Sequence, residues 1–178
     1  VNNYRVNSGK ACVEINGLEV KLPIPGKHNA LNAAAVLKTL NVLGYSDEKA
    51  IPALENFNGV WRRFDNAGMN VNGAEVYDDY AHNPEKIASC IRAAHEISSG
   101  KVFVVFQPHG FGPFGFMRDA LFAELEKFLC ENDEFILLPP YYAGGTSSFK
   151  PTSEEVTASY QRTGNKKYLC YSKRSELK

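Results

Sequence analysis

Residues 74 to 178 alternate between strand-like and helix-like segments, and this alternation constrains the fold more than any other feature of the chain. Apolar, β-favouring runs occupy residues 74–79, 101–106, 134–138 and 167–171. Segments whose apolar residues follow helical spacing lie between these runs. Strands that alternate with helices form parallel sheets with right-handed crossovers. We therefore predict an α/β fold built on a doubly wound sheet.

Polar side chains gather where three of the predicted strands end. The carboxyl ends of parallel strands meet at one edge of a sheet, so we expect these loops to lie together and to bind a ligand. A solvated loop is the alternative for each of them. After the first strand, Asn83-Pro84 has the residues of an N-cap and a first helical position. The three loops contribute Asp78, Asp79, Tyr80, His82, Gln107, His109, Tyr141 and Tyr142.

The first 58 residues predict a hairpin followed by two helices. Asn16-Gly17 separates two runs of alternating polarity, and this dipeptide favours a type I′ turn because both of its residues tolerate positive φ. An Ala/Leu-rich helix is expected over residues 30–43, and a second helix after Ser46.

Three polar residues stand at the start of the first of these helices. They are His28, Asn29 and Asn32. An asparagine amide offers both a donor and an acceptor, which suits an adenine edge or a ribose. Helix capping is the alternative for His28 and Asn29, whereas Asn32 is harder to explain as a cap.

The segment that joins the two parts of the chain carries Trp61 and two arginines. The planar guanidinium of Arg63 suits bidentate contact with phosphate. The alternative is a surface arginine that lies over Trp61. Asn72-Gly73 follows as a second hairpin turn, so residues 74–79 return as a strand.

Composition excludes several classes of function. The 178 residues carry a formal net charge of zero, which indicates neither a nucleic-acid nor a membrane partner. The four cysteines form no C-x-x-C pair, so we expect buried thiols in a reducing cytoplasm and no metal site. The sequence contains no Walker A motif and no G-x-G-x-x-G. Because it starts at Val1 within what looks like a sheet, we expect a fragment of a longer protein.

Several motifs, in order, resemble those of the Mur ligase family. Residues 25–34 resemble its G-x-H-N-x-x-N-x-x-A segment, and residues 57–64 its F-x-G-x-x-R-R-F link between domains. Residues 78–84 match its D-D-Y-A-H-x-P motif. Residues 106–109 match the F-Q-P-H of the L-alanine-adding branch, and residues 142–144 resemble that branch's Y-x-A-G.

The resemblance implies a Rossmann-like C-terminal domain and an ATP-dependent amide ligase of peptidoglycan synthesis. In this family ATP phosphorylates a substrate carboxylate, and an amine then attacks the acyl phosphate. Residues 1–58 would be the end of the central ATPase domain, and residues 59–178 a C-terminal domain truncated at its end. The implied partners are UDP-N-acetylmuramate and an amino acid or short peptide, in the bacterial cytoplasm. The implied cofactors are ATP and magnesium, with the magnesium ligands in the missing N-terminal part.

The same resemblance assigns roles to individual residues. His28, Asn29 and Asn32 would lie against the adenine or its ribose. Arg63 would contact the ATP phosphates, and Asp79 would hold the ribose. Tyr80 and His82 would border the incoming amino acid, with His109 nearby. The implied catalytic residues are Arg63, His82 and His109.

The sequence departs from the L-alanine-adding branch at one loop. That branch carries Q-P-H-R-Y-S-R, whose arginines face the amino-acid carboxylate and the phosphates. Here Gly110 and Pro113 replace the two arginines, and Arg118 is the nearest arginine that could compensate. A ligase that recycles a ready-made tripeptide and a non-catalytic Mur-like binding module are therefore the alternatives.

Overall fold

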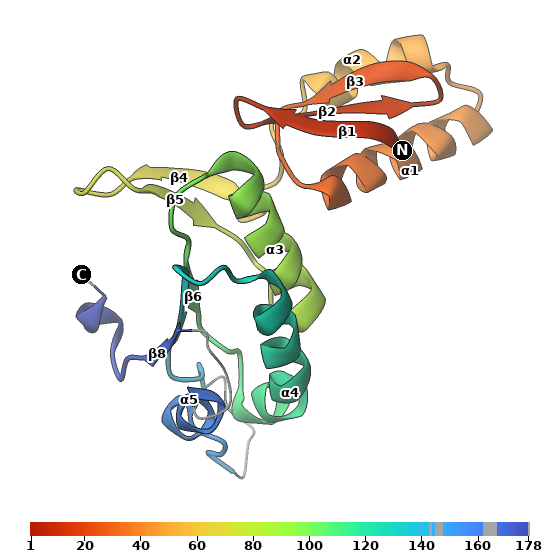
Figure 1. Cartoon of the computed structure of the whole chain (residues 1–178). Helices are drawn as coiled ribbons and strands as arrows, with labels where there is room; N and C mark the ends of the chain where they lie inside the picture. Colours follow the sequence, from red (N-terminus) through yellow and green to blue (C-terminus); the bar gives the residue numbers. More distant parts are fainter. Residues whose placement is uncertain (143, 145–147, 162–166, 178) are drawn as a thin grey trace. The chain divides into compact units, whose positions relative to one another are not determined.

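The computed structural model describes residues 1–142, 144, 148–161 and 167–177. Residues 1–81 together with 92–99 form one compact unit, and residues 82–91 together with 100–178 form the other. Figure 1 traces the chain through both units, and each unit has its own buried residues.

The first unit begins with a three-stranded antiparallel sheet in sequential order. Its turn at Asn16 and Gly17 has φ of 53° and 79°, so the predicted type I′ hairpin is confirmed. Both helices predicted in this part of the chain are present, and the first begins three residues earlier than expected. The elements are β1 (Asn2–Asn7), β2 (Lys10–Ile15), β3 (Leu18–Leu22), α1 (Lys27–Val42) and α2 (Asp47–Glu55).

The core of this sheet follows from the alternation of side chains along its strands. Every second residue of β2 points to one face, which the two helices cover. The small residues of α1 let this helix approach the sheet closely. The buried set is Ala11, Val13, Ile15, Val20, Leu22, Ala30, Ala33, Leu37 and Ala50.

A separate hairpin completes the strands of the first unit. β4 (Asp65–Met69) pairs antiparallel with β5 (Glu75–Asp78), so the predicted second hairpin is confirmed. The side chain of Asn70 stabilises its turn by accepting the N–H groups of Asn72 at 3.0 Å and Ala74 at 2.9 Å. We expected β5 to open the parallel sheet. Among the described residues, however, its only ladder is the one with β4.

The second unit confirms the predicted α/β architecture. Its sheet is parallel, with β6, β7 and β8 in sequential order. Helix α3 begins in this unit, and its last residues belong to the first. The elements are α3 (Pro84–Ile97), β6 (Phe103–Phe106), α4 (Phe111–Phe128), β7 (Glu134–Leu137), α5 (Ser153–Gln161), β8 (Lys167–Cys170) and the 3₁₀ turn Arg174–Glu176.

An aromatic cluster shows that α4 and α5 cover the same face of this sheet. The ring of Phe122 on α4 stacks on Tyr160 of α5 at 3.9 Å between centroids. The same ring meets Tyr168 of β8 edge-on at 4.9 Å and Phe135 of β7 at 6.1 Å. Edge-to-face pairs of this kind are favourable beyond the area that they bury.

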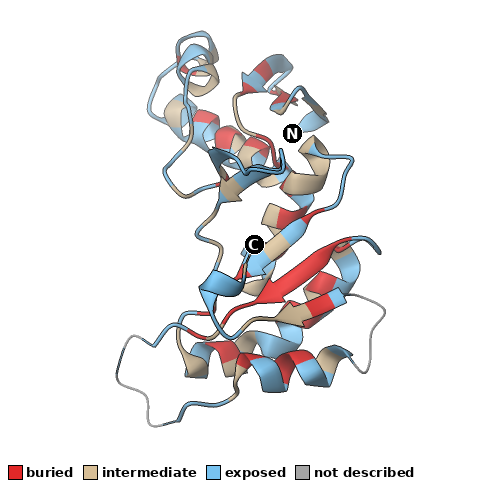
Figure 2. Ribbon diagram, turned by 90° about the vertical axis from the view of Figure 1, so that its left-hand side faces the viewer, coloured by how far each residue is buried: buried red, intermediate tan, exposed pale blue. Residues whose placement is uncertain are grey.

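The strands β6 and β7 differ in how far they are buried. β7 is buried along its whole length, as its apolar sequence predicted (Figure 2). β6 was expected to be buried on both faces, and this was wrong because Phe103 is 55% and Val105 48% exposed. Phe103 and Val105 lie two residues apart, so they share one face of the strand, and that face of β6 is open to solvent. No helix in the described part of the chain is long and apolar enough to cross a membrane.

Candidate functional site

A tight turn at residues 61–65, called the arginine turn below, positions the two adjacent arginines. Arg62 and Phe64 both adopt the left-handed region, with φ of 58° and 51°. Backbone hydrogen bonds fix the turn: the N–H of Tyr80 donates to the Arg62 carbonyl at 2.9 Å, and the N–H of Arg63 to that of Val60 at 3.0 Å. The turn is thereby joined to the loop that follows β5.

The two arginines of this turn have different partners. Arg62 Nε lies 3.0 Å from a carboxylate oxygen of Asp78, and its guanidinium lies 5.2 Å from the centre of the Tyr80 ring. The Arg63 guanidinium lies 5.7 Å from the same ring. Among the described residues, no carboxylate pairs with Arg63. The Arg62 side chain is therefore engaged in contacts within the protein, whereas the exposed Arg63 keeps its hydrogen-bond donors available.

The Asp79 carboxylate accepts two backbone hydrogen bonds. Its Oδ2 accepts from the N–H of Phe64 at 2.8 Å, and its Oδ1 from the N–H of Ala81 at 2.7 Å. The Phe64 side chain is buried and stacks on Tyr77 at 4.6 Å between ring centroids. Asp79, Tyr80 and Arg63 are thus brought together, as the strand-end reasoning expected for the first two.

The polar residues at the start of the first long helix lie within its first two turns. α1 begins at Lys27, and its N-cap is Gly26. Asn29 donates from its amide to the Pro25 carbonyl at 2.6 Å, so it does not cap a free N–H group. Asn32 is exposed, and its amide has no partner within the described ranges. Burial lowers the pKa of His28, and the negative charge of Asp79 partly opposes that shift.

The start of α3 has the predicted geometry. Asn83 Oδ1 accepts the N–H of Lys86 at 3.0 Å, which is the N-cap hydrogen bond expected from Asn83-Pro84. His82 precedes this cap and is exposed. Its Nε2 lies 3.4 Å from Lys86 Nζ, one helical turn further on.

The loops after β6 and β7 run together beyond the strands, as predicted for the carboxyl edge of a parallel sheet. His109 forms a parallel bridge with Tyr141, and their rings lie 5.4 Å apart. Gln107 donates to the Pro139 carbonyl at 3.0 Å and accepts a hydrogen bond from Arg174. His109 is exposed on this edge, so it can reach a ligand. No hydrogen bond or ring contact within the described residues joins it to His82.

Gly110 shapes the loop that departs from the family motif. It has φ of 93°, donates its N–H to the Tyr141 carbonyl at 3.0 Å and is the N-cap of α4. An L side chain at this φ is strained, so the loop is built for glycine. Tyr142 packs against Phe149 at 5.2 Å. Ala143, which belongs to the motif at 142–144, lies outside the described residues.

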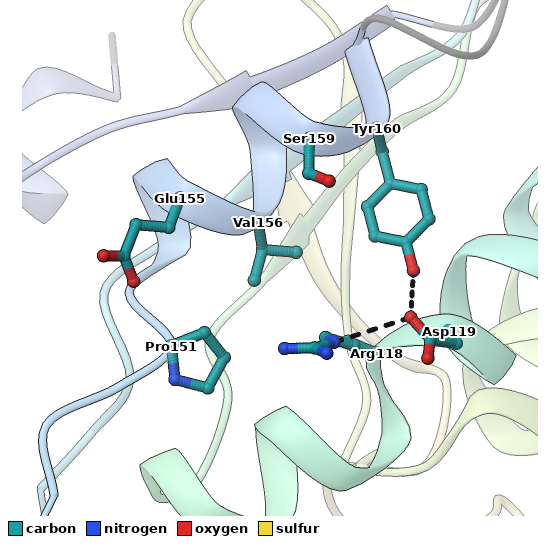
Figure 3. Close-up of a pocket in the computed structure, with 7 residues that line it drawn as sticks. All are labelled: Arg118, Asp119, Pro151, Glu155, Val156, Ser159 and Tyr160. Atoms are coloured by element: carbon teal, nitrogen blue, oxygen red, sulfur yellow. Dashed lines mark hydrogen bonds and ion pairs between the residues drawn. The ribbon is translucent and has the colours of Figure 1, made fainter.

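Arg118 does not extend toward this edge. It lines a hollow of about 290 Å³ between α4 and α5, beside Asp119 (Figure 3). Its Nε lies 3.5 Å from the Asp119 carboxylate, which also accepts from the Tyr160 hydroxyl. His109 is not among the residues that line this hollow. Arg118 is therefore placed on the helical face rather than beside the His109 loop.

The donor set of the arginine turn suits phosphate rather than a metal ion. Arg63 supplies an exposed guanidinium. The carboxylate of Asp78 is paired with Arg62, and both oxygens of Asp79 accept backbone N–H groups. Hard cations such as Mg²⁺ need free carboxylate oxygens. We therefore assign no magnesium ligand to these residues and derive no step through the ion.

Residues 62–177 match the family described as Mur ligase, glutamate ligase domain. The match includes the arginine turn, the loop after β5 and the parallel sheet, and the chain belongs to the Mur ligase family.

Individual relatives agree with this assignment. The chain is 42% identical to a UDP-N-acetylmuramate–L-alanine ligase from Xanthobacter autotrophicus over 143 residues, which are 80% of this chain and 28% of the relative. It is 37% identical to one from Chelativorans sp. over 150 residues, which are 83% of this chain and 31% of the relative. The crystal structure of a UDP-N-acetylmuramate–alanine ligase from Thermotoga maritima matches 99% of this chain and 37% of its own, with a TM-score of 0.73 and 32% identity. The chain thus spans about a third of the length of these relatives.

Sequence reasoning missed two features of the site. Asp79 bonds to the Ala81 N–H two residues on, and this Asx-turn is a local signal that could have been found. The contact between Gln107 and Arg174 joins residues 67 positions apart, and nothing in the local sequence indicates it.

Proposed function

We propose that this chain is the C-terminal portion of a UDP-N-acetylmuramate–L-alanine ligase, an ATP-dependent acid–amino acid ligase. In this proposal residues 1–58 are the end of the central ATPase domain, and residues 59–178 belong to the C-terminal domain. The ligase works in the bacterial cytoplasm, where ATP is available. Its magnesium ligands lie on parts of the protein that precede this chain.

The single observation that carries the proposal is the position of Arg63. Arg63 stands where the family motif has its second arginine. The turn that carries it is hydrogen-bonded to Asp79, and its guanidinium lies 5.7 Å from the centre of the Tyr80 ring. It has no carboxylate partner among the described residues, whereas its neighbour Arg62 has one at 3.0 Å. A guanidinium held in place but left unpaired suits the phosphates of a nucleotide.

The reaction has two balanced steps. A carboxylate oxygen of UDP-N-acetylmuramate attacks the γ-phosphorus of ATP, and ADP leaves. The amine of L-alanine then attacks the carbonyl carbon of the acyl phosphate, and phosphate leaves as the amide forms and the nitrogen loses a proton. Arg63 stabilises the negative charge on the phosphoryl oxygens in the first step. Exclusion of water protects the acyl phosphate between the two steps.

The remaining residues take binding roles in this proposal. His28, Asn29 and Asn32 contact the adenine or its ribose through ring and amide groups on α1. Asp79 accepts a hydrogen bond from a ribose hydroxyl, using lone pairs that its two backbone hydrogen bonds leave free. Tyr80, His82 and His109 border the incoming amino acid.

The loop after β6 favours a second candidate, a ligase that attaches a ready-made tripeptide. Gly110 and Pro113 leave this loop without the two arginines that face the amino-acid carboxylate in the alanine-adding branch. A larger acceptor would present its carboxylate further from the amine, where these arginines are not needed. A Mur-like module that binds nucleotide without turnover is the third possibility.

Phosphate release by the complete ligase separates these candidates. We expect release from ATP only when UDP-N-acetylmuramate and L-alanine are both present. A preference for a ready-made tripeptide over alanine would support the recycling ligase. Nucleotide binding with no phosphate release under either condition would contradict both and support the binding module.

A further inference from the structure

The carboxylate of Asp79 joins two segments that are separated along the chain. Its Oδ2 accepts the N–H of Phe64, 15 residues earlier, at 2.8 Å. Its Oδ1 accepts the N–H of Ala81, in its own loop, at 2.7 Å. The neighbouring Asp78 instead forms an ion pair with the Arg62 side chain at 3.0 Å. Asp79 therefore ties the arginine turn to the loop after β5 through backbone groups.

The turn that Asp79 holds has an unfavourable backbone. Arg62 and Phe64 have φ of 58° and 51°, where the Cβ of an L residue approaches its own backbone. Such conformations persist only where surrounding interactions over-determine them, and they concentrate at functional sites. The bond from the Phe64 N–H to Asp79 acts directly on one of these two residues.

Arg63 lies between the two left-handed residues, so their backbone sets the direction in which its side chain leaves the turn. We propose that Asp79 is a positioning residue, whose carboxylate fixes the arginine turn and thereby directs the Arg63 guanidinium toward the nucleotide phosphates. This inference rests on the proposed function, because it takes Arg63 as the phosphate contact. It assigns Asp79 a role that does not require the ribose.

The chemistry of the side chain makes this role separable from ribose binding. A carboxylate offers four lone-pair sites, of which the two backbone bonds use two. An asparagine has a single acceptor oxygen, so Asp79→Asn keeps one bond at most and directs its own N–H₂ at the other donor. The lost bond affects Arg63 whichever nucleotide is bound.

The decisive experiment uses nucleotides that lack one ribose hydroxyl. Asp79→Asn in the complete ligase should lower kcat/KM by about tenfold or more with ATP, and a loss of at least about threefold should remain with 2′-deoxy-ATP and with 3′-deoxy-ATP. A loss seen with ATP that disappears with either deoxynucleotide would overturn the proposal, because Asp79 would then act on that hydroxyl. Glu131→Gln, which changes an exposed carboxylate outside the arginine turn, is the control, and it should change kcat/KM by less than about threefold with each nucleotide.

Coupling to Arg63 provides a second readout, which a merely structural residue would not affect. If Asp79 acts through Arg63, the double variant Asp79→Asn/Arg63→Lys should be no slower than the slower single variant, within about twofold. Independent, multiplicative losses would contradict the proposal. Should Asp79→Asn fail to fold, Asp79→Glu keeps the charge but displaces both hydrogen bonds, and the same comparisons apply.

Trypsin distinguishes failure of this inference from failure of the proposed function. If the complete protein proves to have no ligase activity, the proposed function fails, and cleavage after Arg62 or Arg63 still reports on the turn. Asp79→Asn should accelerate that cleavage about tenfold while Glu131→Gln, at an exposed carboxylate outside the turn, leaves it unchanged. Equal cleavage rates in the wild type and Asp79→Asn would contradict the positioning role of Asp79.

Discussion

Adjacent arginines with the same chemistry have different surroundings in the arginine turn. Arg62 is held by Asp78 and by the rings of Trp61 and Tyr80, at 5.7 and 5.2 Å. Arg63 contacts the Tyr80 ring and no carboxylate of the described residues. The structure thus separates an arginine that stabilises the turn from one that is available to a ligand.

Lysine substitution tests this difference. Arg63→Lys keeps a positive charge but loses the planar fork, so in the complete ligase we expect the KM for ATP to rise about tenfold. Arg62→Lys keeps the positive charge that faces Asp78 and the two rings, so it should shift the KM by less than about threefold. Steady-state kinetics at saturating acceptor measure both. Equal effects of the two variants would show that the guanidinium of Arg63 has no special contact.

Gly110 supports a second prediction, about stability. Its φ of 93° is strained for an L residue, and a Cβ there would lie 3.4 Å from Pro113 Cδ. We expect Gly110→Ala to lower the free energy of unfolding by about 1–2 kcal/mol. Gly112→Ala is the control, because it has no positive φ and open space around its Cα, so it should be neutral or slightly stabilising. Urea denaturation of both variants measures the difference, and equal destabilisation would contradict the strain argument.

The sequence indicates which residues lie near the arginine turn but not their bonds, and the roles of these residues in a site stay predictions. Arg63, Asp79 and Tyr80 were selected because a polar loop follows a strand and an arginine pair stands beside a tryptophan. The bond between Asp79 and the Phe64 N–H depends on how the hairpin folds back, and no local pattern encodes that geometry. Whether Asn29 capped the helix was likewise undecidable, since the helix start at Lys27 had first to be located.

At the scale of elements, local signals were reliable and the choice of partner strands was less so. Asn16-Gly17 and Asn83-Pro84 produced the turn and the N-cap that their chemistry dictates. The strand at β5 was found, but its alternating pattern fits any neighbour. It pairs with β4 because the two are joined by a short turn, and sequence-adjacent antiparallel pairing involves little loop-closure entropy.

The aromatic cluster of α4, α5, β7 and β8 allows a test of packing. Phe122 is 1% exposed and contacts three other rings, whereas Phe116 on the same helix is 94% exposed. Phe122→Ala should lower the free energy of unfolding by about 3–5 kcal/mol. Phe116→Ala should change it by less than about 0.5 kcal/mol. Thermal or urea unfolding compares them, and a loss below about 1 kcal/mol for Phe122→Ala would refute the cluster as a source of stability.

A carboxylate on β7 predicts how stability depends on pH. Hydrogen bonds from Lys101, at 2.6 Å, and from Lys167 lower the pKa of Glu134 below its ordinary value of 4.5. The unfolded chain therefore binds a proton at higher pH than the folded one. The stabilisation is complete above pH 4.5 and is lost as the pH falls through the lower folded pKa.

Replacing this carboxylate should flatten the acid side of the stability curve. Glu134→Gln should be less stable than the wild type near pH 7. Between about pH 5 and pH 3 its free energy of unfolding should fall less than that of the wild type. Glu131→Gln removes an exposed carboxylate three residues earlier and should leave the curve unchanged. Denaturation midpoints measured across this range compare the three proteins. A parallel acid limb in Glu134→Gln and the wild type would show that the two lysines do not set the pKa.

At the scale of the whole molecule, the α/β class followed from the alternation of segments, whereas the division into units did not. Periodicity places elements in order along the chain but does not state which buried faces share a core. The boundary expected between residues 58 and 59 stays a prediction. One set of buried residues includes Val13 of β2 in the first unit, and another surrounds Phe122 of α4 in the second.

Two separate sets of buried residues predict that damage to one core stays local. Val13 is fully buried and packs with α1 and α2, so Val13→Ala should cost about 2 kcal/mol of local stability. Hydrogen exchange should then speed up in β1, β2 and β3, with β6, β7 and β8 unaffected. Phe122→Ala should give the reverse pattern, which makes each variant the control for the other. Faster exchange throughout the chain in either variant would mean that the two units unfold as one, because only cooperative unfolding exposes the distant strands.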